Sequence, residues 1–531
     1  MAKPNSAETT VMYDRRRWTN WFGNLNFRPE RHYRAASLLQ LVEIVRDARA
    51  AGGHLRAYGS RGAFAPIAVC DQGMVDTRHL DRDLRGVVPE ALKDQGRAMS
   101  RGGHLVHVQA GVTLRALSER LDVPRENRCR LTLPTMGGAA FQSIAGAIST
   151  GTHGGDIELK PLPDYVRAIH LVGADGCQHW IEPAVGAITD EDRLRAALRS
   201  GEPWFDDDML EVHYDDALFD AALVSLGRLG IVYSLVVEAV EQFGLDERLE
   251  HTVWSSARDL LTVDGVTAQH RGPEAAHFLE VVLYPYARRD GQLSSFVTRR
   301  TKVDAPQYKR WRYPTVLSRL AAVRVPFLPT LGQVVGWLLN GALNLGLAGL
   351  VRWTGRHALR AGRPRRRKRQ VGYQVMDLSS AIGETYRGVG MEVFLNMKGG
   401  GHLAFIDDVL LPLFAEYAER GDVFPGYVSL RTMRASHALL AMQRWPHTCS
   451  IEIGVFEGIR HTKEFLAEVQ FAAISAGATV HWGQHHDTSA KEVERMYPDL
   501  PAWQEAVAVL GATSGDVFDN EYCSSHGLEP R

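Results

Sequence analysis

The chain has 531 residues, of which 45% are hydrophobic and 23% are charged, the profile of an ordinary globular protein. Its 61 Lys and Arg residues are balanced by 62 Asp and Glu residues, so net charge provides no drive toward nucleic acid. The length is sufficient for two or three domains.

Five scattered cysteines include no CxxC pair, so neither a disulfide framework nor a metal site is expected. Free cysteines fit a reducing compartment. The N-terminal residues lack the apolar segment of a secretory signal. The chain is therefore predicted to be cytoplasmic, with the alternative of a peripheral position at a membrane that is discussed below.

The N-terminal part alternates predicted helices and strands. Apolar residues at helical spacing predict a helix over 36–51, which Gly52 and Gly53 end. A second helix is expected to begin near Thr113, a favoured N-cap residue type. Alternation and β-branched content predict four strands, at residues 54–58, 105–109, 165–172 and 231–240. The segment Ala174-Asp175-Gly176 predicts a hairpin turn.

These elements suggest three parts. Residues 1–245 form a first domain, residues 246–480 form a second with a predicted strand at 278–284, and residues 481–531 form a C-terminal segment. An apolar insertion followed by basic residues occupies 325–369 of the second domain. No internal repeat is found.

The strongest local signal is the segment Pro134–Gly155, PTMGGAAFQSIAGAISTGTHGG. Its small residues allow backbone N–H groups to approach a phosphate or a flat ring closely. A packing helix of small residues is the alternative. The Ser, Thr and His donors within the segment favour a ligand, because a packing face needs few of them.

Two further glycine loops precede or follow strands. Tyr58–Phe64 (YGSRGAF) lacks the GxGxxG spacing of a dinucleotide fingerprint and could be a plain turn. Leu226–Val232 (LGRLGIV) places two glycines just before a strand, where backbone groups could hydrogen-bond a heterocycle. Each loop is a weak signal by itself.

In this order and spacing the three segments resemble the FAD-binding domain of the vanillyl-alcohol-oxidase (PCMH-type) superfamily. The resemblance is strongest to its sugar-lactone oxidase, alditol oxidase and flavin-type cholesterol oxidase branch, and it extends to the tail motifs HWG, MYPDLPAWQ and DVFDN. It implies an α+β fold, in which a two-subdomain FAD-binding domain is joined to an α/β cap domain with an antiparallel sheet. The tail is then expected to return to the flavin.

The resemblance also assigns the cofactor-binding residues. The first loop would hold the pyrophosphate, the central segment would run along the pyrophosphate and isoalloxazine, and the third loop would contact the flavin. The residues so assigned are Gly59, Ser60, Arg61, Gly62, Ala63, Ser143, Gly146, Ser149, Thr150, His153, Gly154, Gly230, Ile231 and Val232.

Two departures from the family pattern affect the flavin. Many members carry in the first loop a histidine bonded to the flavin, and the aligned residue here is Gly62, so FAD is predicted to bind without a covalent link. The tail motif HWGK reads HWGQ here, which places the neutral Gln484 where a lysine would stabilise the reduced flavin. No metal is expected in the site.

Five residues are candidates for catalysis, with Gln484 as the group at the flavin edge. Glu452, among isoleucines on a predicted strand, would have a raised pKa that suits a general base, unless it faces solvent. The family often carries a Glu-x-Arg pair over the flavin, and this chain keeps the arginine, Arg431, but has Ser429 in place of the glutamate. Arg431 could orient a substrate oxygen, or form a surface ion pair. Asn520 matches an Asn near the flavin in the cholesterol oxidase branch, or is a turn residue, and His481 is the alternative base.

Residues 325–351 contain no charged side chain, and a basic cluster follows from Arg352 to Arg369. A membrane-spanning helix is disfavoured by prolines and glycines, and because the tail must return to the flavin. A buried helical hairpin lining the substrate cavity and a membrane-surface patch are the other interpretations. Both indicate an apolar or lipid-like substrate.

The leading hypothesis is an FAD-dependent alcohol oxidase or dehydrogenase that moves a hydride from a CH–OH group to the flavin. Its partners would be a small-molecule substrate, either apolar or of polyol or lactone type, and O₂ or another electron acceptor. A flavin-dependent reductase of the same superfamily and a non-catalytic, membrane-associated flavin-binding protein are the alternatives.

Overall fold

The structure is a computed structural model that describes most of the chain. The described residues are 13–84, 88–94, 104–124, 129–201, 205–272, 275–305, 331–363, 365–378, 388–456, 458–513 and 515–531. Among them no peptide bond is cis.

The first part of the chain builds a small sheet in the order β1-β4-β6-β5. Helix α2, Leu38–Ala50, packs beside it and confirms the predicted helix over 36–51. The helix begins where the Ser37 side chain accepts from the Gln40 N–H, and its apolar stripe faces the core. The strands of the small sheet are β1 (Tyr13–Asp14), β4 (Arg31–Arg34), β5 (Arg56–Tyr58) and β6 (Gly73–Asp76). Strands β2 (Trp18–Thr19) and β3 (Asn26–Phe27) pair in a separate two-stranded sheet.

A five-stranded sheet follows in the order β11-β10-β9-β12-β7, with helices packed against it. Strand β7 has the predicted bounds, and α5 begins after Thr113, whose side chain caps it. The elements are β7 (Leu105–Gln109), α5 (Leu114–Leu121), α6 (Ile144–Ser149), β9 (Val166–Val172), β10 (Gln178–Glu182), α7 (Glu191–Gly201), β11 (Leu210–Tyr214), α8 (Asp216–Leu223) and β12 (Ile231–Glu238). Short elements α3 (Val88–Ala91), β8 (Leu131–Thr132) and β13 (Val240–Glu241) complete this half.

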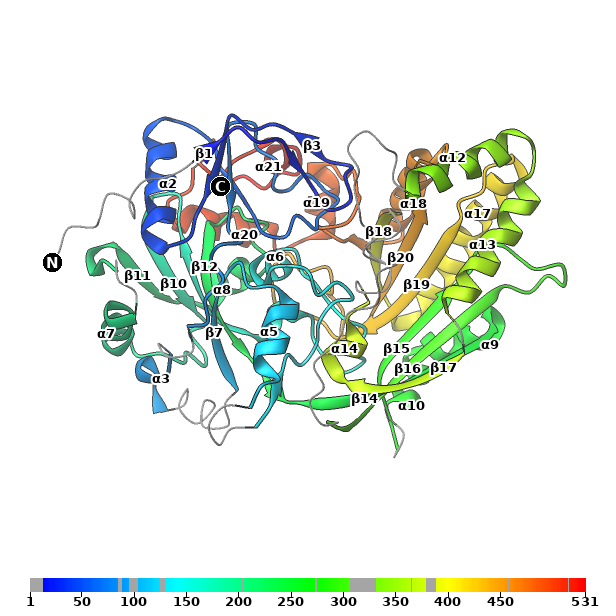
Figure 1. Ribbon diagram of the computed structural model, residues 1–531, viewed down its shortest axis with the longest axis horizontal. Coiled ribbons are helices and arrows are strands. Elements are labelled where there is room, and N and C mark those ends of the chain that lie inside the picture. Colours follow the sequence, from blue (N-terminus) through cyan, green and yellow to red (C-terminus); the bar gives the residue numbers. More distant parts are fainter. Residues whose placement is uncertain are drawn as a thin grey trace.

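The second half is an eight-stranded sheet in the order β17-β14-β16-β15-β19-β20-β18-β21, and its neighbouring strands are antiparallel. Figure 1 shows it at the right of the molecule with helices on its outer side. The strands are β14 (Phe243–Val253), β15 (Ala276–Leu283), β16 (Ser294–Asp304), β17 (Arg366–Val371), β18 (Gly388–Asn396), β19 (Gly426–Met433), β20 (Thr448–Phe456) and β21 (Thr479–Val480). The helices are α9 (Trp254–Ala257), α10 (Val263–Gln269), α14 (Gly372–Met376), α16 (Gly401–Ala404), α17 (Leu411–Glu419) and α18 (Thr462–Ser475). Together the two halves confirm the predicted α+β class, with an antiparallel sheet in the cap.

The C-terminal segment crosses back to the first half, where Figure 1 shows its red helices. Its helices are α19 (Ala490–Met496), α20 (Leu500–Val509) and α21 (Glu521–Ser525). Backbone hydrogen bonds hold it there, since Leu55 N–H donates to Val517 O and Phe64 N–H donates to Gly483 O.

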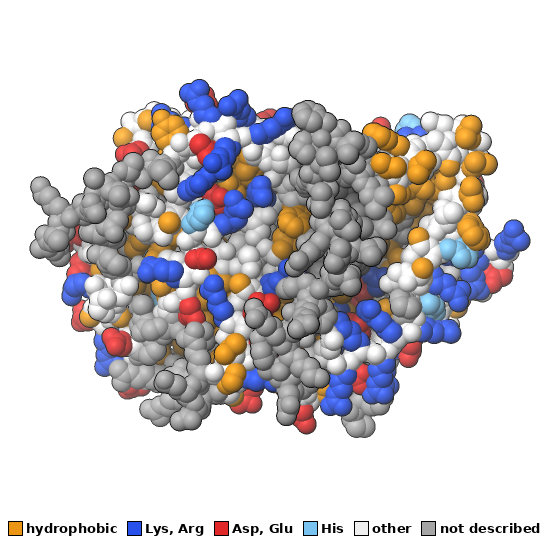
Figure 2. All heavy atoms as spheres, in the orientation of Figure 1, with side chains coloured by type: hydrophobic (Ala, Val, Ile, Leu, Met, Phe, Trp, Pro, Cys, Tyr) orange, Lys and Arg blue, Asp and Glu red, His pale blue; other side chains and the backbone are white. Residues whose placement is uncertain are grey.

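The uncharged stretch and the first part of the basic cluster form a helical hairpin of α12 (Leu331–Asn344) and α13 (Ala348–Gly362). Residues 325–330 lie outside the described residues. In the described part of the chain, no helix is long and apolar enough to cross a membrane. The prediction of a buried hairpin lining the substrate cavity is wrong, because only part of it packs on the protein. Its exposed apolar side chains contribute to the orange patches at the upper right of Figure 2, and they are Trp337, Leu338, Leu345, Leu347, Leu350 and Trp353.

Candidate active site

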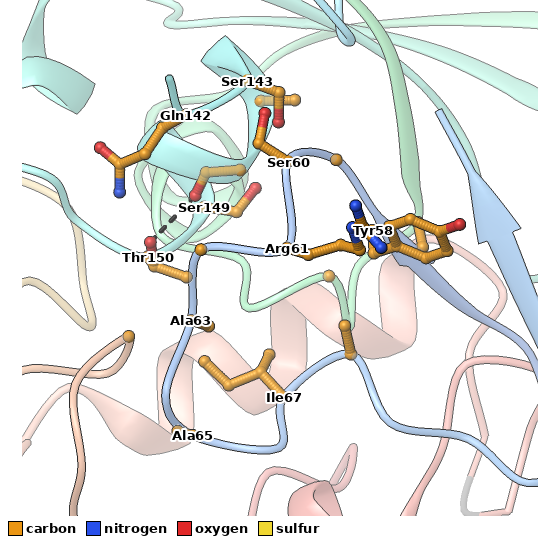
Figure 3. Close-up of a pocket in the computed structure, with 18 of the residues that line it drawn as sticks. Tyr58, Ser60, Arg61, Ala63, Ala65, Ile67, Gln142, Ser143, Ser149 and Thr150 are labelled. Atoms are coloured by element: carbon orange, nitrogen blue, oxygen red, sulfur yellow. Dashed lines mark hydrogen bonds between the residues drawn. The ribbon is translucent and has the colours of Figure 1, made fainter. Parts of the chain in front are cut away.

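A pocket opens between the first glycine loop, α6, the loop before β12 and the start of the C-terminal segment. Figure 3 shows the loop from Tyr58 to Ile67 curving around one side, with Ser143 close to Ser60 and with Ser149 and Thr150 further along the α6 segment. Most of the predicted cofactor residues line this pocket. They are Gly59, Ser60, Arg61, Gly62, Ala63, Ser143, Gly146, Ser149, Thr150, Gly230, Ile231 and Val232.

The predicted residues His153 and Gly154 are not in this wall. Gly154 packs tightly instead, because a Cβ there would lie 2.6 Å from both Asp156 Oδ2 and Thr135 Oγ1. His153 points toward the cap sheet, as described below. The chain therefore leaves the pocket before reaching these two residues.

Close approach explains the glycines of the first loop. A Cβ on Gly59 would lie 1.8 Å from Ser143 Oγ, so only glycine lets the loop touch the N-terminus of α6. Two non-glycine residues of the wall, Arg61 and Leu226, have left-handed backbone with φ of 62° and 52°. Such strain persists where the surroundings enforce it, and it concentrates at ligand sites.

The pocket fits a flat cofactor held by backbone groups. A Cβ added to Gly146 would meet only Ser143 Oγ, at 3.0 Å, and otherwise open space. The wall contains the buried Oε1 of Gln484, which has no hydrogen-bond partner among the residues that the structure describes. A buried acceptor of this kind is usually satisfied by a ligand or water. FAD, with its ring N–H and its ribityl hydroxyls, supplies such donors.

Arg56 organises the pocket, and sequence reasoning missed it. Its side chain is 2% exposed and donates to four carbonyl oxygens drawn from the first loop, the loop before β12 and the C-terminal segment. The acceptors are Ile67 O, Gly227 O, Phe518 O and Leu226 O. The signal that could have revealed it is the position of Arg56, a charged residue, in the short and largely buried strand β5.

We expect Arg56→Met to lower the free energy of unfolding strongly. The substitution keeps an apolar stem of similar length but removes the donor from Gly227 O, Phe518 O and Leu226 O, while Ile67 O keeps the Asn520 amide. Each buried polar group left unpaired costs about 1–3 kcal/mol. Chemical denaturation of the FAD-loaded protein would measure the loss. Arg120→Met is a matched control, because Arg120 donates to a single carbonyl at an exposed position. Equal stability of the two variants would contradict the role given to Arg56.

A charged cluster lies in the cap sheet, beyond the pocket. The strand register places Glu280 opposite Arg431, and Glu452 opposite both Ser429 and Glu392. Arg431 Nη2 donates to Glu392 Oε1 and to Glu452 Oε2, both at 2.7 Å. Tyr427 Oη donates to the other oxygen of Glu452 at 3.3 Å.

The cluster is sheltered from solvent, so two alternative interpretations from the sequence are wrong. The Arg431 side chain is 13% exposed and is no surface ion pair, and the Glu452 side chain is 20% exposed rather than facing solvent. Burial raises the pKa of Glu452, with Arg431 opposing and Glu392 and Glu280 adding to the rise. Burial acts in the same direction on Glu392, but Arg431 and His153 outweigh it and lower the pKa of that carboxyl. The two carboxylates thus have different proton affinities.

Two histidines join the cluster to the pocket. His153 Nε2 lies 3.3 Å from Glu392 Oε2, and the His153 and His481 rings are 5.7 Å apart. His481 also lines the pocket, as does Gln484. Burial lowers the pKa of His481 to about 4, despite the opposing charge of Glu392, so at neutral pH this imidazole is uncharged.

His153, Glu392 and His481 lie close enough together to hold a metal ion. The Arg431 guanidinium, bonded to the same Glu392 carboxylate, already supplies positive charge there. A second cation beside it would be repelled. We therefore interpret this group as part of a charge network.

The structure does not bring Asn520 to the cluster. Its side-chain oxygen accepts from the Cys523 N–H and caps α21, and its Nδ2 donates to Ile67 O and Val69 O. Asn520 thus fixes the loop behind the pocket, and the predicted catalytic role is wrong. Sequence reasoning missed Glu392, Glu280 and Tyr427, although each acidic residue is a lone charge within an apolar strand.

Comparisons with known proteins agree with this geometry. The FAD binding domain family matches residues 29–182, and the D-arabinono-1,4-lactone oxidase family matches residues 415–526. The crystal structure of a cholesterol oxidase from B. sterolicum superposes with a TM-score of 0.68 over 99% of each chain, at 13% sequence identity. That likeness shows the fold. The two family matches are consistent with the PCMH-type flavoprotein superfamily, and the FAD binding domain supports FAD as the cofactor.

The chain is an FAD-dependent oxidoreductase similar to sugar-lactone and alditol oxidases. It is 25% identical to L-gulono-1,4-lactone dehydrogenase of Mycobacterium tuberculosis, over 95% of this chain and 97% of that enzyme. It is 26% identical to D-arabinono-1,4-lactone oxidase of Saccharomyces cerevisiae over 51% of this chain, and spans 42% of the length of that relative. Alditol oxidase of a Streptomyces species is 26% identical over 56% of this chain and 57% of that enzyme.

Proposed function

We propose that this protein oxidises a secondary or primary alcohol group of a small polyhydroxylated molecule, such as a sugar lactone or an alditol. The observation that carries the proposal is the Arg431 guanidinium clamped between Glu392 and Glu452, next to a histidine of the pocket wall. FAD supplies the two-electron acceptor when bound.

The protein groups have separate tasks in this proposal. Glu452, with its raised pKa, accepts the hydroxyl proton of the substrate. Arg431 orients a substrate oxygen with its planar fork while holding Glu452 in place. The neutral His481 can donate or accept a hydrogen bond at the pocket edge.

The polarity of the cluster favours polyols and lactones over lipid-like substrates. The apolar hairpin of α12 and α13, which suggested an apolar substrate, exposes its large side chains at the surface. The cap sheet instead presents carboxylates, a guanidinium and a phenol. Such groups match several hydroxyls, and the buried Arg431 Nε–H, which has no partner among the described residues, would stay unpaired beside a hydrocarbon.

An anaerobic substrate screen tests the function. Lactones, alditols, sterols and simple alcohols are added under nitrogen, and bleaching of the flavin absorbance is recorded. We expect polyols or lactones to bleach the flavin and sterols to leave it oxidised. Flavin reduction by NADPH would indicate the reductase alternative, and no bleaching by any alcohol would refute the proposal. Admitting O₂ to the reduced protein then shows whether O₂ or another acceptor reoxidises it.

We also propose that FAD is held without a covalent bond. Gly62 has no nucleophilic side chain, and the first loop contributes no histidine or cysteine to the pocket. Acid precipitation should therefore release all of the flavin into the supernatant, measured by its fluorescence. Flavin that stays in the washed precipitate would contradict the proposal.

Contact of residues 325–369 with a membrane surface stays a prediction. Three arginines of the basic cluster form ion pairs, Arg363 with Glu280, Arg366 with Glu247 and Arg367 with Asp246, which leaves less charge for headgroups. Flotation with vesicles containing anionic lipid tests it. Co-flotation that Trp337→Glu abolishes would support the contact, and no flotation would refute it.

A further inference from the structure

A second cluster of ligand-type side chains lies on the five-stranded sheet, outside the FAD pocket. Strands β10 and β11 run parallel at the sheet edge, with His179 opposite Glu211 and Ile181 opposite His213. Because side chains alternate along a strand, His179, Glu211 and His213 project from the same face. In Figure 1 these strands lie at the end of the molecule away from the cap sheet.

The three side chains meet at short range. His179 Nδ1 lies 3.1 Å from His213 Nε2 and 3.5 Å from Glu211 Oε2. His213 Nε2 and Glu211 Oε2 are 3.6 Å apart. A tetrahedral zinc ion with ligands at about 2.0–2.1 Å separates them by about 3.3 Å. The three atoms therefore form a triangle of the size of one face of a zinc tetrahedron.

Hydrogen bonding prepares His179 to act as a ligand. Its Nε2 lies 3.2 Å from Asp175 Oδ1, and that carboxylate oxygen also accepts from the Cys177 N–H. Asp175 therefore favours a proton on Nε2, which leaves the Nδ1 lone pair directed at His213 and Glu211. Carboxylate–histidine pairs of this kind orient metal-binding imidazoles and make them more basic.

Without an ion, the three side chains have fewer hydrogen-bond donors than acceptors. The His213 Nε2–H is one donor facing two acceptors, His179 Nδ1 and the Glu211 carboxylate. A divalent cation would satisfy all three. The Glu211 side chain is 55% exposed and His179 is fully buried, so the triangle opens toward solvent on the Glu211 side. Arg46 and Arg49 of α2 lie near Cys177 and Asp175 and would reduce, without cancelling, the attraction for a cation.

We propose that His179, His213 and Glu211 bind a zinc ion that joins the edge strand β11 to β10. Two imidazoles and one carboxylate are the ligand types that zinc takes in proteins. None of the three lines the FAD pocket, so the ion would support the fold of the FAD-binding half and take no part in the oxidation.

Zinc titration of the untagged, FAD-loaded and EDTA-treated protein tests the site by calorimetry. We expect one saturable Zn²⁺ per chain, and at least about a tenfold weaker affinity for His213→Gln and for Glu211→Gln. Both residues are partly exposed, so the variants should fold, and their FAD content checks this. His357→Gln, which changes an exposed histidine on α13, should bind zinc as the parent does.

Zinc should also raise the Tm of the parent and not that of His213→Gln, because an ion that binds only the folded state stabilises it. No saturable binding would overturn the proposal. Equal affinities of the parent and both variants would overturn it as well, and the cluster would then be a hydrogen-bonded histidine pair.

Discussion

Replacing Glu452 with Gln should slow flavin reduction by about 10²–10⁴-fold while FAD remains bound. A positioned general base contributes an acceleration of this order, equivalent to roughly 3–5 kcal/mol of barrier. Gln keeps the shape of the side chain and can still accept from Arg431, at 2.7 Å in the parent, but it cannot take a proton. Substrate binding should therefore change much less than the rate. Stopped-flow bleaching of the flavin under nitrogen, across a substrate series, measures both.

The pH dependence gives a second test of the same residue. A base works only when it is deprotonated, and burial raises the pKa of Glu452 above its ordinary value of 4.5. In the parent, the reduction rate should rise with pH through this shifted pKa and then level off. In Glu452→Gln that rise should be absent.

Arg431→Lys serves as the companion variant. A lysine is a point charge and cannot reproduce the two-sided contact with Glu392 and Glu452, so we expect weaker substrate binding as well as a slower rate. If Glu452→Gln reduces its flavin within a few-fold of the parent rate, Glu452 is not the base. His481, which lines the pocket and is uncharged at neutral pH, would then be the next candidate.

Gly146→Val should yield a folded protein that does not retain FAD. The position lies in α6 in the pocket wall, and a Cβ there points into space bounded on one side by Ser143 Oγ at 3.0 Å. Forcing extra carbon atoms into an occupied site costs about 1–3 kcal/mol or more, which corresponds to a loss of affinity of about 100-fold at the upper end. The ratio of flavin to protein absorbance after gel filtration measures the loss.

Gly146→Ala is the matched control, since it adds only the first carbon atom and improves helix propensity. It should keep most of the flavin. Circular dichroism should show that both variants are folded. A yellow, folded Gly146→Val protein would mean that the cofactor does not pass along this face of α6.

The sequence by itself determined the fold class, the cofactor and much of the pocket wall. The fold class, the cofactor and the pocket wall followed from the resemblance of three glycine-rich segments and the tail motifs, in their order and spacing, to a flavoprotein superfamily. The helices α2 and α5 followed from local patterns, namely the apolar periodicity of α2 and the cap at Thr113. A glycine such as Gly59 is needed because the backbone must approach another segment, and its position in the loop is visible without knowing that segment.

Only the tertiary structure decided which charged side chains form ion pairs with one another. Arg431, Glu392, Glu452 and Glu280 come from four strands, and the register of the sheet brings them together. Likewise Arg56 is a pocket organiser because three distant segments present carbonyls to it, and Asn520 is a cap because α21 begins there. The sequence left open whether the apolar hairpin is buried or forms a surface patch, and the structure exposes its large apolar side chains. Burial and ion pairing depend on contacts between residues far apart in the chain, which no local pattern encodes.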